Sequence, residues 1–488
     1  MSPGSGTEPG RRPVSLAGRW DALVVGAGPA GLFCALQIVA AGCRRVLVID
    51  RGPDASGRAH PPRGSASRGS YESGVGGAGL FSDGKLCLSL DVGGHLETAL
   101  DSARRERLLD DIEGVFTALM EPKPERPRPP SRLGDLIDQA ERNGLGFKYY
   151  PVQHIGTDRC GDVIVRLVGA LRRGGATVAA STTLRDVHTD PVTRTKHAIV
   201  ETSSGTHRVD ADRVVLAMGK IGAGAQAELC EQLGVPVERQ PIYVGVRFEA
   251  DAPALAPLFA GTKDPKYNLT FDDGSKIKTH CASSNGDILE LQYDGLPLAG
   301  GHNYRGSESG RSGFSLLWNG ASAGDPYRYA KSLMAATSRQ TAGRLLVQSV
   351  TDYRARRPST HESLSGFRLT NPAASPGDVR AILPPDYLWR CEQFLERLRA
   401  IAPELLAADS VFYAPAIEWW MRRNEVVSPY METRSPGVYV CGDGSGWSQG
   451  IVHAAATGLL AGQSIAGQRA SVASWVARRV ADGTTAFT

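Results

Sequence analysis

Asp21-Ala-Leu-Val-Val-Gly26-Ala-Gly28-Pro-Ala-Gly31 opens a pattern that closes at Val46-Leu-Val-Ile-Asp50. Four aliphatic residues lead into a tight glycine turn, an apolar helix follows, and a second aliphatic run ends in an acid. This order is typical of a βαβ unit that binds a dinucleotide. The first glycine permits the turn, the second leaves room for a pyrophosphate, and the third lets helix and strand pack closely. The pattern predicts an α/β, Rossmann-like domain.

The same unit predicts which groups of the nucleotide are held. A helix N-terminus offers free N–H groups and a positive dipole end to phosphates, which assigns the phosphates to Gly26, Gly28, Pro29, Ala30 and Gly31. Asp50, followed by Arg51, ends the second strand and is expected to accept hydrogen bonds from the ribose 2′- and 3′-OH. An acid in this place disfavours a 2′-phosphate and leaves FAD or NAD.

A glycine-rich segment far along the chain favours FAD. Gly437-Val-Tyr-Val-Cys441-Gly442-Asp443-Gly444 indicates a turn and a short buried strand, and a small-residue helix starts at Gly450-Ile451. In FAD proteins of the glutathione-reductase type, such a strand returns to the first domain with its Asp near the ribityl chain or the pyrophosphate. The next helix N-terminus faces the flavin, where its dipole stabilises negative charge. We therefore expect Gly442, Asp443, Gly450 and Ile451 to bind the flavin half of FAD.

Two further segments fit an FAD domain. Asp212-Arg-Val-Val-Leu-Ala217-Met-Gly219 resembles the Ala-Thr-Gly strand of two-domain flavoproteins, which assigns Ala217 and Gly219 to the cofactor site. A three-stranded polar meander is expected over residues 176–209. Within it, Leu184 lies where such folds set backbone against adenine.

The run Gly74-Val-Gly76-Gly77-Ala78-Gly79-Leu-Phe81-Ser82-Asp83-Gly84-Lys85-Leu86 connects these segments to a family. It resembles the flavin-facing loop of a family of largely uncharacterised FAD-dependent dehydrogenases. The resemblance recurs at 154–158, 245–249, 264–266 and 441–451, so it extends from about Asp21 to about Gly462. It implies that Gly76, Gly77, Ala78 and Lys85 lie at the flavin, with Lys85 as a cation near N1.

The chain departs from this family in its middle. Lys220-Ile-Gly-Ala-Gly-Ala stands where members carry His-Ser-Ala-Arg-Asp, and Lys278-Thr-His280-Cys281-Ala-Ser283-Ser284 where they carry Arg-Thr-Phe-Cys-x-Cys-Pro. Glu418-Trp419-Trp420 replaces a Glu-Thr-Arg-like segment. Because the differences lie where a substrate would bind, the resemblance implies the cofactor and leaves the substrate open.

These anchors predict a glutathione-reductase-type, Rossmann-like FAD-binding domain with an inserted mixed α+β substrate domain. The FAD-binding domain is expected at 18–219 plus 426–470, and the substrate-binding domain at 220–425. Residues 1–17 and 471–488 are expected to be tails, the first disordered. Helical runs are expected at 327–353 and 384–402.

Composition excludes several other classes of protein. At 488 residues and 41% hydrophobic, the chain can bury the cores of two domains. A net charge of +4 with scattered basic residues argues against nucleic-acid binding, and no apolar segment is long enough to predict a membrane span. The eight cysteines form no C-x-x-C pair and the ten histidines no H-x-x-x-H pattern, so the sequence predicts no metal site. The same cysteine pattern favours reduced thiols in a cytoplasm.

The proton that accompanies hydride transfer needs a partner, and five polar residues are candidates: His280, His302, Tyr304, Glu418 and His453. Three are preferred as catalytic residues, namely Tyr304 and His302 on one segment and Glu418 beside Trp419. An acid among large aromatic residues has a buried partner or a raised pKa. Glu418 could also simply pair with Arg422 on a helix.

The sequence therefore predicts an FAD-dependent oxidoreductase, a dehydrogenase or reductase that transfers a hydride between flavin and a small organic metabolite. One alternative is a flavin monooxygenase using NAD(P)H and O₂. Another is a flavoprotein whose FAD is structural or gates binding of a partner. The stretch Gly219-Lys-Ile-Gly-Ala-Gly-Ala lacks an acid-terminated second strand, so we expect no dedicated nicotinamide domain and an external electron donor or acceptor.

Overall fold

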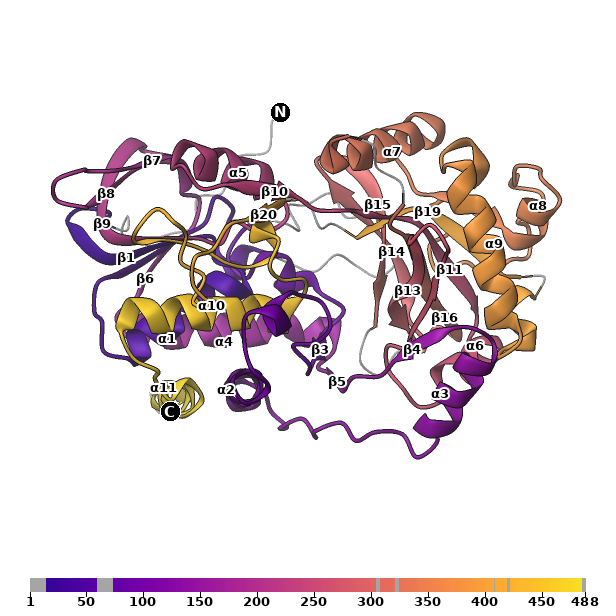
Figure 1. The fold of residues 1–488 in the computed structure, drawn as a ribbon, viewed down its shortest axis with the longest axis horizontal. Coiled ribbons are helices and arrows are strands. Elements are labelled where there is room, and N and C mark those ends of the chain that lie inside the picture. The colour runs from indigo at the N-terminus through magenta and orange to yellow at the C-terminus, as the bar shows by residue number, and fades with distance from the viewer. Residues whose placement is uncertain are drawn as a thin grey trace, which may run out of the picture.

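A computed structural model describes residues 15–58, 73–303, 308–320, 324–407, 409–418 and 422–484. These residues form two bodies, each built on its own β-sheet, with the N- and C-terminal parts of the chain in the same body (Figure 1). The first is a Rossmann-like α/β body. The second is a larger mixed sheet covered by helices.

The first body contains a seven-stranded mixed sheet. Its central strands β2, β1, β9 and β21 run parallel, because β1 pairs with both β2 and β9 and β21 pairs with the other side of β9. Beyond them, β9, β8 and β7 form the antiparallel meander that the sequence predicts. The strands are β1 (Arg19–Val25), β2 (Val46–Ile49), β6 (Thr177–Ala179), β7 (Thr183–Thr189), β8 (Lys196–Thr202), β9 (Gly205–Leu216) and β21 (Val438–Val440).

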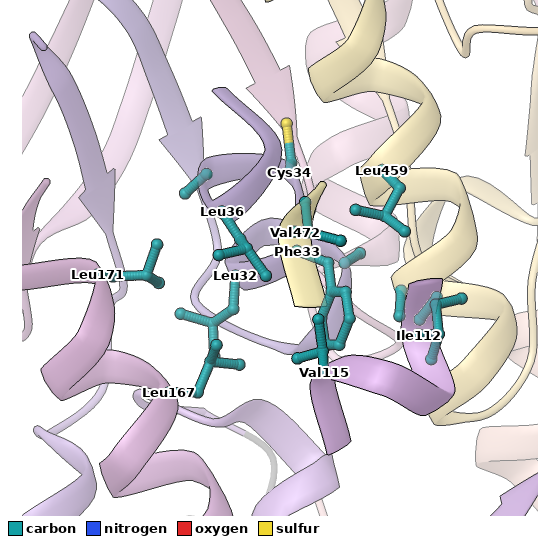
Figure 2. Close-up of a cluster of buried hydrophobic side chains, with 14 of the residues drawn as sticks. Leu32, Phe33, Cys34, Leu36, Ile112, Val115, Leu167, Leu171, Leu459 and Val472 are labelled. Carbon is teal, nitrogen blue, oxygen red and sulfur yellow. The ribbon is translucent and has the colours of Figure 1, made fainter. Parts of the chain in front are cut away.

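Five helices lie on one side of this sheet, two of them packed on the other three, and α5 (Ala223–Gln232) packs on the other side. The five are α1 (Pro29–Ala40), α2 (Ser102–Leu119), α4 (Cys160–Arg173), α10 (Ile451–Ala466) and α11 (Val472–Thr484). Figure 2 shows that α1 is the centre of the packing, with Phe33 next to Val115 of α2 and Leu32 next to Leu167 of α4. Helices from the first 173 residues and the last two helices of the described chain therefore share one core.

An eight-stranded sheet forms the second body, in the order β18-β17-β19-β11-β16-β13-β12-β4. Its strands are β4 (Gly146–Lys148), β11 (Tyr243–Asp251), β12 (Lys266–Thr270), β13 (Lys276–Ser283), β16 (Arg311–Trp318), β17 (Leu346–Ser349), β18 (Ser375–Pro376) and β19 (Val411–Glu418). Helices pack with it, namely α3 (Leu133–Arg142), α6 (Ala252–Phe259), α7 (Pro326–Thr341), α8 (Val350–Arg354) and α9 (Pro385–Arg399). The hairpin of β14 (Asp287–Tyr293) and β15 (Leu296–His302) lies on the side toward the first body (Figure 1).

Two short ribbons lie between the bodies. In one, β10 (Val237–Arg239) and β20 (Arg422–Asn424) pair as the chain leaves and re-enters the first body. In the other, β3 (Lys85–Cys87), which follows the predicted flavin loop, pairs with β5 (Val152–His154).

The structure corrects three of the sequence predictions. Residues 133–148 belong to the second body, because Leu136 packs in its core and β4 extends its sheet beside β12. The predicted C-terminal tail is helix α11, whose Val472 and Val476 are fully buried. The helical run at 327–353 is interrupted by strand β17.

Candidate functional site

The turn between β1 and α1 contains three glycines with different roles. Gly26 has φ +106°, and a Cβ there would lie 2.1 Å from the Ala217 carbonyl oxygen. A Cβ on Gly31 would lie 1.9 Å from the carbonyl oxygen of Gly26. A Cβ on Gly28, in contrast, would meet only the Cα of Gly77, at 3.8 Å. Gly26 and Gly31 are therefore required by the packing, whereas Gly28 borders open space at the N-terminus of α1.

Helix α1 begins at Pro29 and has no side-chain cap and no acid in its first turn. Its first N–H groups are therefore available to an anion. Asp50, at the end of β2, accepts hydrogen bonds from the N–H of Ala27 at 2.9 Å and of Gly52 at 3.0 Å. Each carboxylate oxygen keeps a lone pair that a ribose hydroxyl can use. Arg51 is exposed and donates to the Ser73 hydroxyl at 2.8 Å.

The loop at 74–79 lies directly over this turn. The N–H of Gly76 donates to the Ala27 carbonyl at 2.8 Å, and a Cβ on Gly77 would lie 2.9 Å from the Cα of Gly28. Ala78 follows in the short helix η2 (Gly77–Phe81). The loop that resembles a flavin-facing segment thus borders the open side of the nucleotide turn.

Arg58 holds that loop and was not found by sequence reasoning. It is buried, and its guanidinium donates to the carbonyls of Gly74 at 3.0 Å, Val75 at 2.9 Å and Gly77 at 3.0 Å. Burial lowers the pKa of Arg58 to about 10, so the side chain remains a cation at neutral pH. No local pattern distinguishes it from the other arginines of the connection at 52–70.

The C-terminal glycine segment reaches the same edge of the sheet through β21. Gly444 packs on Gly219, since a Cβ there would lie 2.5 Å from the Gly219 carbonyl oxygen. Asp443 accepts hydrogen bonds from the Ser448 hydroxyl at 3.0 Å and the Gly450 N–H at 3.3 Å. Burial raises the pKa of Asp443.

Helix α10 starts at Ile451, after Gly450 with φ +91° and without a side-chain cap. It crosses α1 closely, because a Cβ on Gly458 would lie 2.0 Å from the Ala30 carbonyl oxygen. The Thr182 N–H donates to the Asp50 carbonyl at 2.8 Å, and Leu184 is buried two residues further on. The predicted cofactor residues thus gather at one edge of the sheet.

Lys85 has a different environment from the predicted one. Its side chain is 4% exposed, its Nζ lies 2.8 Å from the Asp83 carboxylate, and it donates to the Ala282 carbonyl. Although burial alone would lower the pKa of Lys85, Asp83 raises it, so the ammonium persists. Because Asp83 already neutralises this charge, the structure argues against a free cation at flavin N1. Lys85 joins β3 to β13 of the second body.

More polar groups surround this junction. Asp264 accepts hydrogen bonds from the Tyr150 hydroxyl at 2.6 Å and the Ala282 N–H at 2.8 Å, and pairs with Lys266 at 3.1 Å. Lys266, followed by Lys85 and Tyr150, holds the pKa of Asp264 well below its usual range despite burial. These contacts set the β13 bulge at 280–283 against the segment that follows the flavin loop.

Glu418 is a buried residue at the end of β19. It pairs with Lys278 Nζ at 2.5 Å, and its carboxylate lies 3.7 Å from His280 Nδ1. Burial would raise the pKa of Glu418, but His280 and Lys278 lower it to about 2. A carboxyl with this pKa is a poor proton donor or acceptor near neutral pH, so the environment of Glu418 favours a role in holding Lys278 over the catalytic role that the sequence predicts. Arg422 is on a strand and pairs with Asp325 at 3.3 Å, so the alternative pairing with Glu418 is also wrong.

The remaining candidates occupy different positions. Tyr304, like Trp419 and Trp420, lies outside the described residues. His302 is buried at the end of β15, with its Nδ1 3.5 Å from the Thr157 hydroxyl of the first body. His453 is buried in α10 and hydrogen-bonds to the Leu90 carbonyl at 3.2 Å. Burial lowers the pKa of His453 to about 4, so it is neutral at neutral pH.

Within the described ranges, no group of His, Cys, Asp and Glu side chains is suited to hold a metal ion. In the same ranges, no helix is both long and apolar enough to cross a membrane.

Comparisons with known proteins agree with the first body. The model of the NAD(P)-binding Rossmann-like domain matches residues 24–110, which contain α1, β2 and the loop at 74–79. The nucleotide turn and this match together define a protein with a Rossmann-like dinucleotide-binding domain. The sequence matches none of the curated proteins with which it was compared.

Several solved structures resemble the chain at low similarity. Glycine oxidase from Geobacillus kaustophilus is 14% identical, with a TM-score of 0.40 over 92% of this chain and 95% of that chain. Pyridoxine 4-oxidase from Mesorbium loti is 14% identical, with a TM-score of 0.42 over 92% and 98%. Aklavinone-11 hydroxylase, in a complex with FAD and aklavinone, is 14% identical with a TM-score of 0.36, and the match covers 92% of this chain but 61% of that chain.

Proposed function

We propose that the protein is an FAD-dependent oxidoreductase of the glutathione-reductase type, a dehydrogenase or reductase that transfers a hydride between flavin and a small organic metabolite. One observation carries this proposal. Three glycine-rich segments that are remote in sequence meet at one sheet edge, since Gly77 lies against Gly28 and Gly442 lies against Ala30.

The residues present at this edge fit FAD. A Cβ on Gly28 would enter open space, and no atom lies within 4 Å of a Cβ built on Gly219 or Gly450. The N-termini of α1 and α10 both lack side-chain caps, so both can serve negatively charged groups. Asp50 would take the ribose, α1 the pyrophosphate, and α10 the flavin ring. Bound FAD would supply hydride transfer.

The protein's own side chains must then orient the substrate and move one proton. The second body faces the loop at 74–86 through the β13 bulge, so it would cover the reactive side of the flavin. His302, at the end of β15 in that body, and Tyr304, two residues further along the sequence, remain candidates for handling this proton. The contacts of Lys85 with the Ala282 carbonyl and of the Cys281 thiol with the Asp83 carboxylate would fix the distance between the two bodies.

An external electron donor or acceptor is part of this proposal. The glycines after β9 lead into α5, and the next strand, β10, pairs antiparallel with β20. A nicotinamide-binding unit would require a parallel strand ending in an acid at that point. This connection therefore favours electron exchange with a separate molecule.

The first test is the identity of the cofactor. Purified protein is expected to be yellow and to release FAD, and not FMN, when denatured. A panel of hydroxy acids, amino acids and amines added under argon should then include a compound that bleaches the flavin without any other reductant. Protein that binds no flavin, or that releases FMN, would refute the proposal. Bleaching by NADPH under argon, followed by product formation when oxygen is admitted, would favour a monooxygenase.

A further inference from the structure

One polar cluster on the second body has no role in holding the cofactor. It consists of Lys278 and His280 on β13, Glu418 on β19 and Tyr243 on β11. Lys278 Nζ lies 2.5 Å from Glu418 and 4.0 Å from the centroid of the Tyr243 ring. The side chains of Lys278 and His280 remain 22% and 26% exposed, whereas that of Glu418 is 3% exposed. The Glu418 carboxylate is thus buried behind two side chains that are partly exposed.

The cluster lies between two segments assigned to the flavin. On one side, His280 precedes Cys281, whose thiol lies 3.6 Å from the Asp83 carboxylate, and Ala282, whose carbonyl accepts from Lys85. At about 3.3 Å per residue, Lys278 is roughly 10 Å along the strand from this contact. On the other side, β20 follows Glu418 and lies against Gly446, where a Cβ would be 2.5 Å from the Arg422 carbonyl oxygen.

We propose that Lys278 is a catalytic residue, whose neutral amine takes the substrate's O–H or N–H proton during oxidation, and that Glu418 is its positioning residue. This proposal rests on the proposed function. The substrate C–H bond breaks and its electron pair leaves as a hydride to the flavin. The O–H or N–H bond breaks as its proton goes to Nζ, and the C–O or C–N bond becomes double. The substrate class is therefore a secondary or primary alcohol or amine.

The charges around Lys278 suit this task. Burial lowers the pKa of Lys278, while the Glu418 carboxylate opposes that change and Lys266 and Lys276 add to it. Burial lowers the pKa of His280, and the Glu418 carboxylate opposes that change. Tyr243 contributes its ring face and stays protonated, because burial raises its pKa to about 12. The Glu418 carboxylate thus positions the Lys278 side chain, and the ammonium groups of Lys266 and Lys276 favour loss of a proton from Lys278.

The test is the pH dependence of amine labelling in the FAD-bound protein. Pulses of formaldehyde and cyanoborohydride between about pH 6 and 11 methylate only neutral amines, and peptide mass spectrometry gives a midpoint for each lysine. Lys278 should have a midpoint below that of Lys123, which is exposed. Glu418→Gln should lower the Lys278 midpoint further. The control Asp294→Asn, which removes the partner of Lys331 at 2.6 Å, should leave it unchanged.

Two results of the labelling experiment would overturn the assignment. In the first, Lys278 stays unlabelled at every pH. In the second, the labelling midpoint of Lys278 in the wild-type protein equals or exceeds that of Lys123, and this comparison does not depend on the folding of any variant. In a second measurement, Lys278→Met should keep FAD yet slow flavin reduction by the fastest compound of the panel about 100- to 10,000-fold. An unchanged rate would also overturn it. Loss of FAD from the wild-type protein would instead refute the proposed function and leave the midpoint unaffected.

Discussion

Gly28→Val should separate FAD binding from folding. Gly28 has φ −78°, which any residue adopts, and a Cβ there meets no atom closer than the Gly77 Cα at 3.8 Å. The added methyl groups would occupy the space in which α1 meets the pyrophosphate. Losing about two charged hydrogen bonds costs about 3 to 6 kcal/mol, which weakens FAD binding about 100- to 10,000-fold. The variant should therefore purify colourless and folded.

The assay combines FAD absorbance with thermal unfolding. FAD present at about 100 times its Kd stabilises a protein by about 2.7 kcal/mol. Gly28→Val should therefore unfold at the same temperature as wild-type protein stripped of FAD. Added FAD should not raise the unfolding temperature of the variant. Gly134→Ala is the matched control, because Gly134 is an exposed helical glycine whose Cβ would meet no atom within 4 Å. It should retain FAD fully. A Gly28→Val protein with full FAD occupancy would refute the assignment of the phosphate site.

Three other perturbations follow from the structure. Arg58→Met should lower both the melting temperature and FAD retention, because the buried carbonyls of Gly74 and Val75 lose their donor at about 1 to 3 kcal/mol each. An unchanged variant would show that Arg58 does not hold the loop. Glu418 has a folded-state pKa of about 2 against an ordinary 4.5, so its stabilising contribution is present above about pH 4.5 and is lost as the pH falls toward 2. Urea unfolding measured across that pH range should show a smaller loss of unfolding free energy for Glu418→Gln than for the wild-type protein. An equal pH dependence in the two proteins would contradict the shift in the pKa of Glu418. Stopped-flow mixing of the FAD-bound protein with NADPH should show flavin reduction far slower than about 10 per second, a typical turnover rate. Bleaching at that rate would contradict the expectation that the protein has no dedicated nicotinamide domain.

The nucleotide turn could be predicted because its constraints are local. The packing around Gly26 and Gly31 follows from the order of strand, turn and helix, and that order is visible in the sequence. The apolar spacing of Val472, Trp475 and Val476 could also have predicted α11, but their position near the end of the chain suggested a tail.

The environment of Lys278 could not be predicted in this way. Its partner Glu418 is brought beside it by the register of β13, β16, β11 and β19, which no short pattern encodes. Arg58 was missed for the same reason, since its carbonyl acceptors lie beyond the next connection. Long-range pairing therefore sets the chemistry of these side chains.

The crossing of α1 and α10 has a consequence for biosynthesis. Gly458 and Gly462 of α10 lie against Ala30 and Cys34 of α1. The ribosome makes α1 among the first helices, whereas α10, which packs on it, is among the last. The second body, complete by Glu418, can collapse on the ribosome while the first still exposes an apolar face. Chains that stop before residue 451 should therefore be substrates for chaperones and proteases.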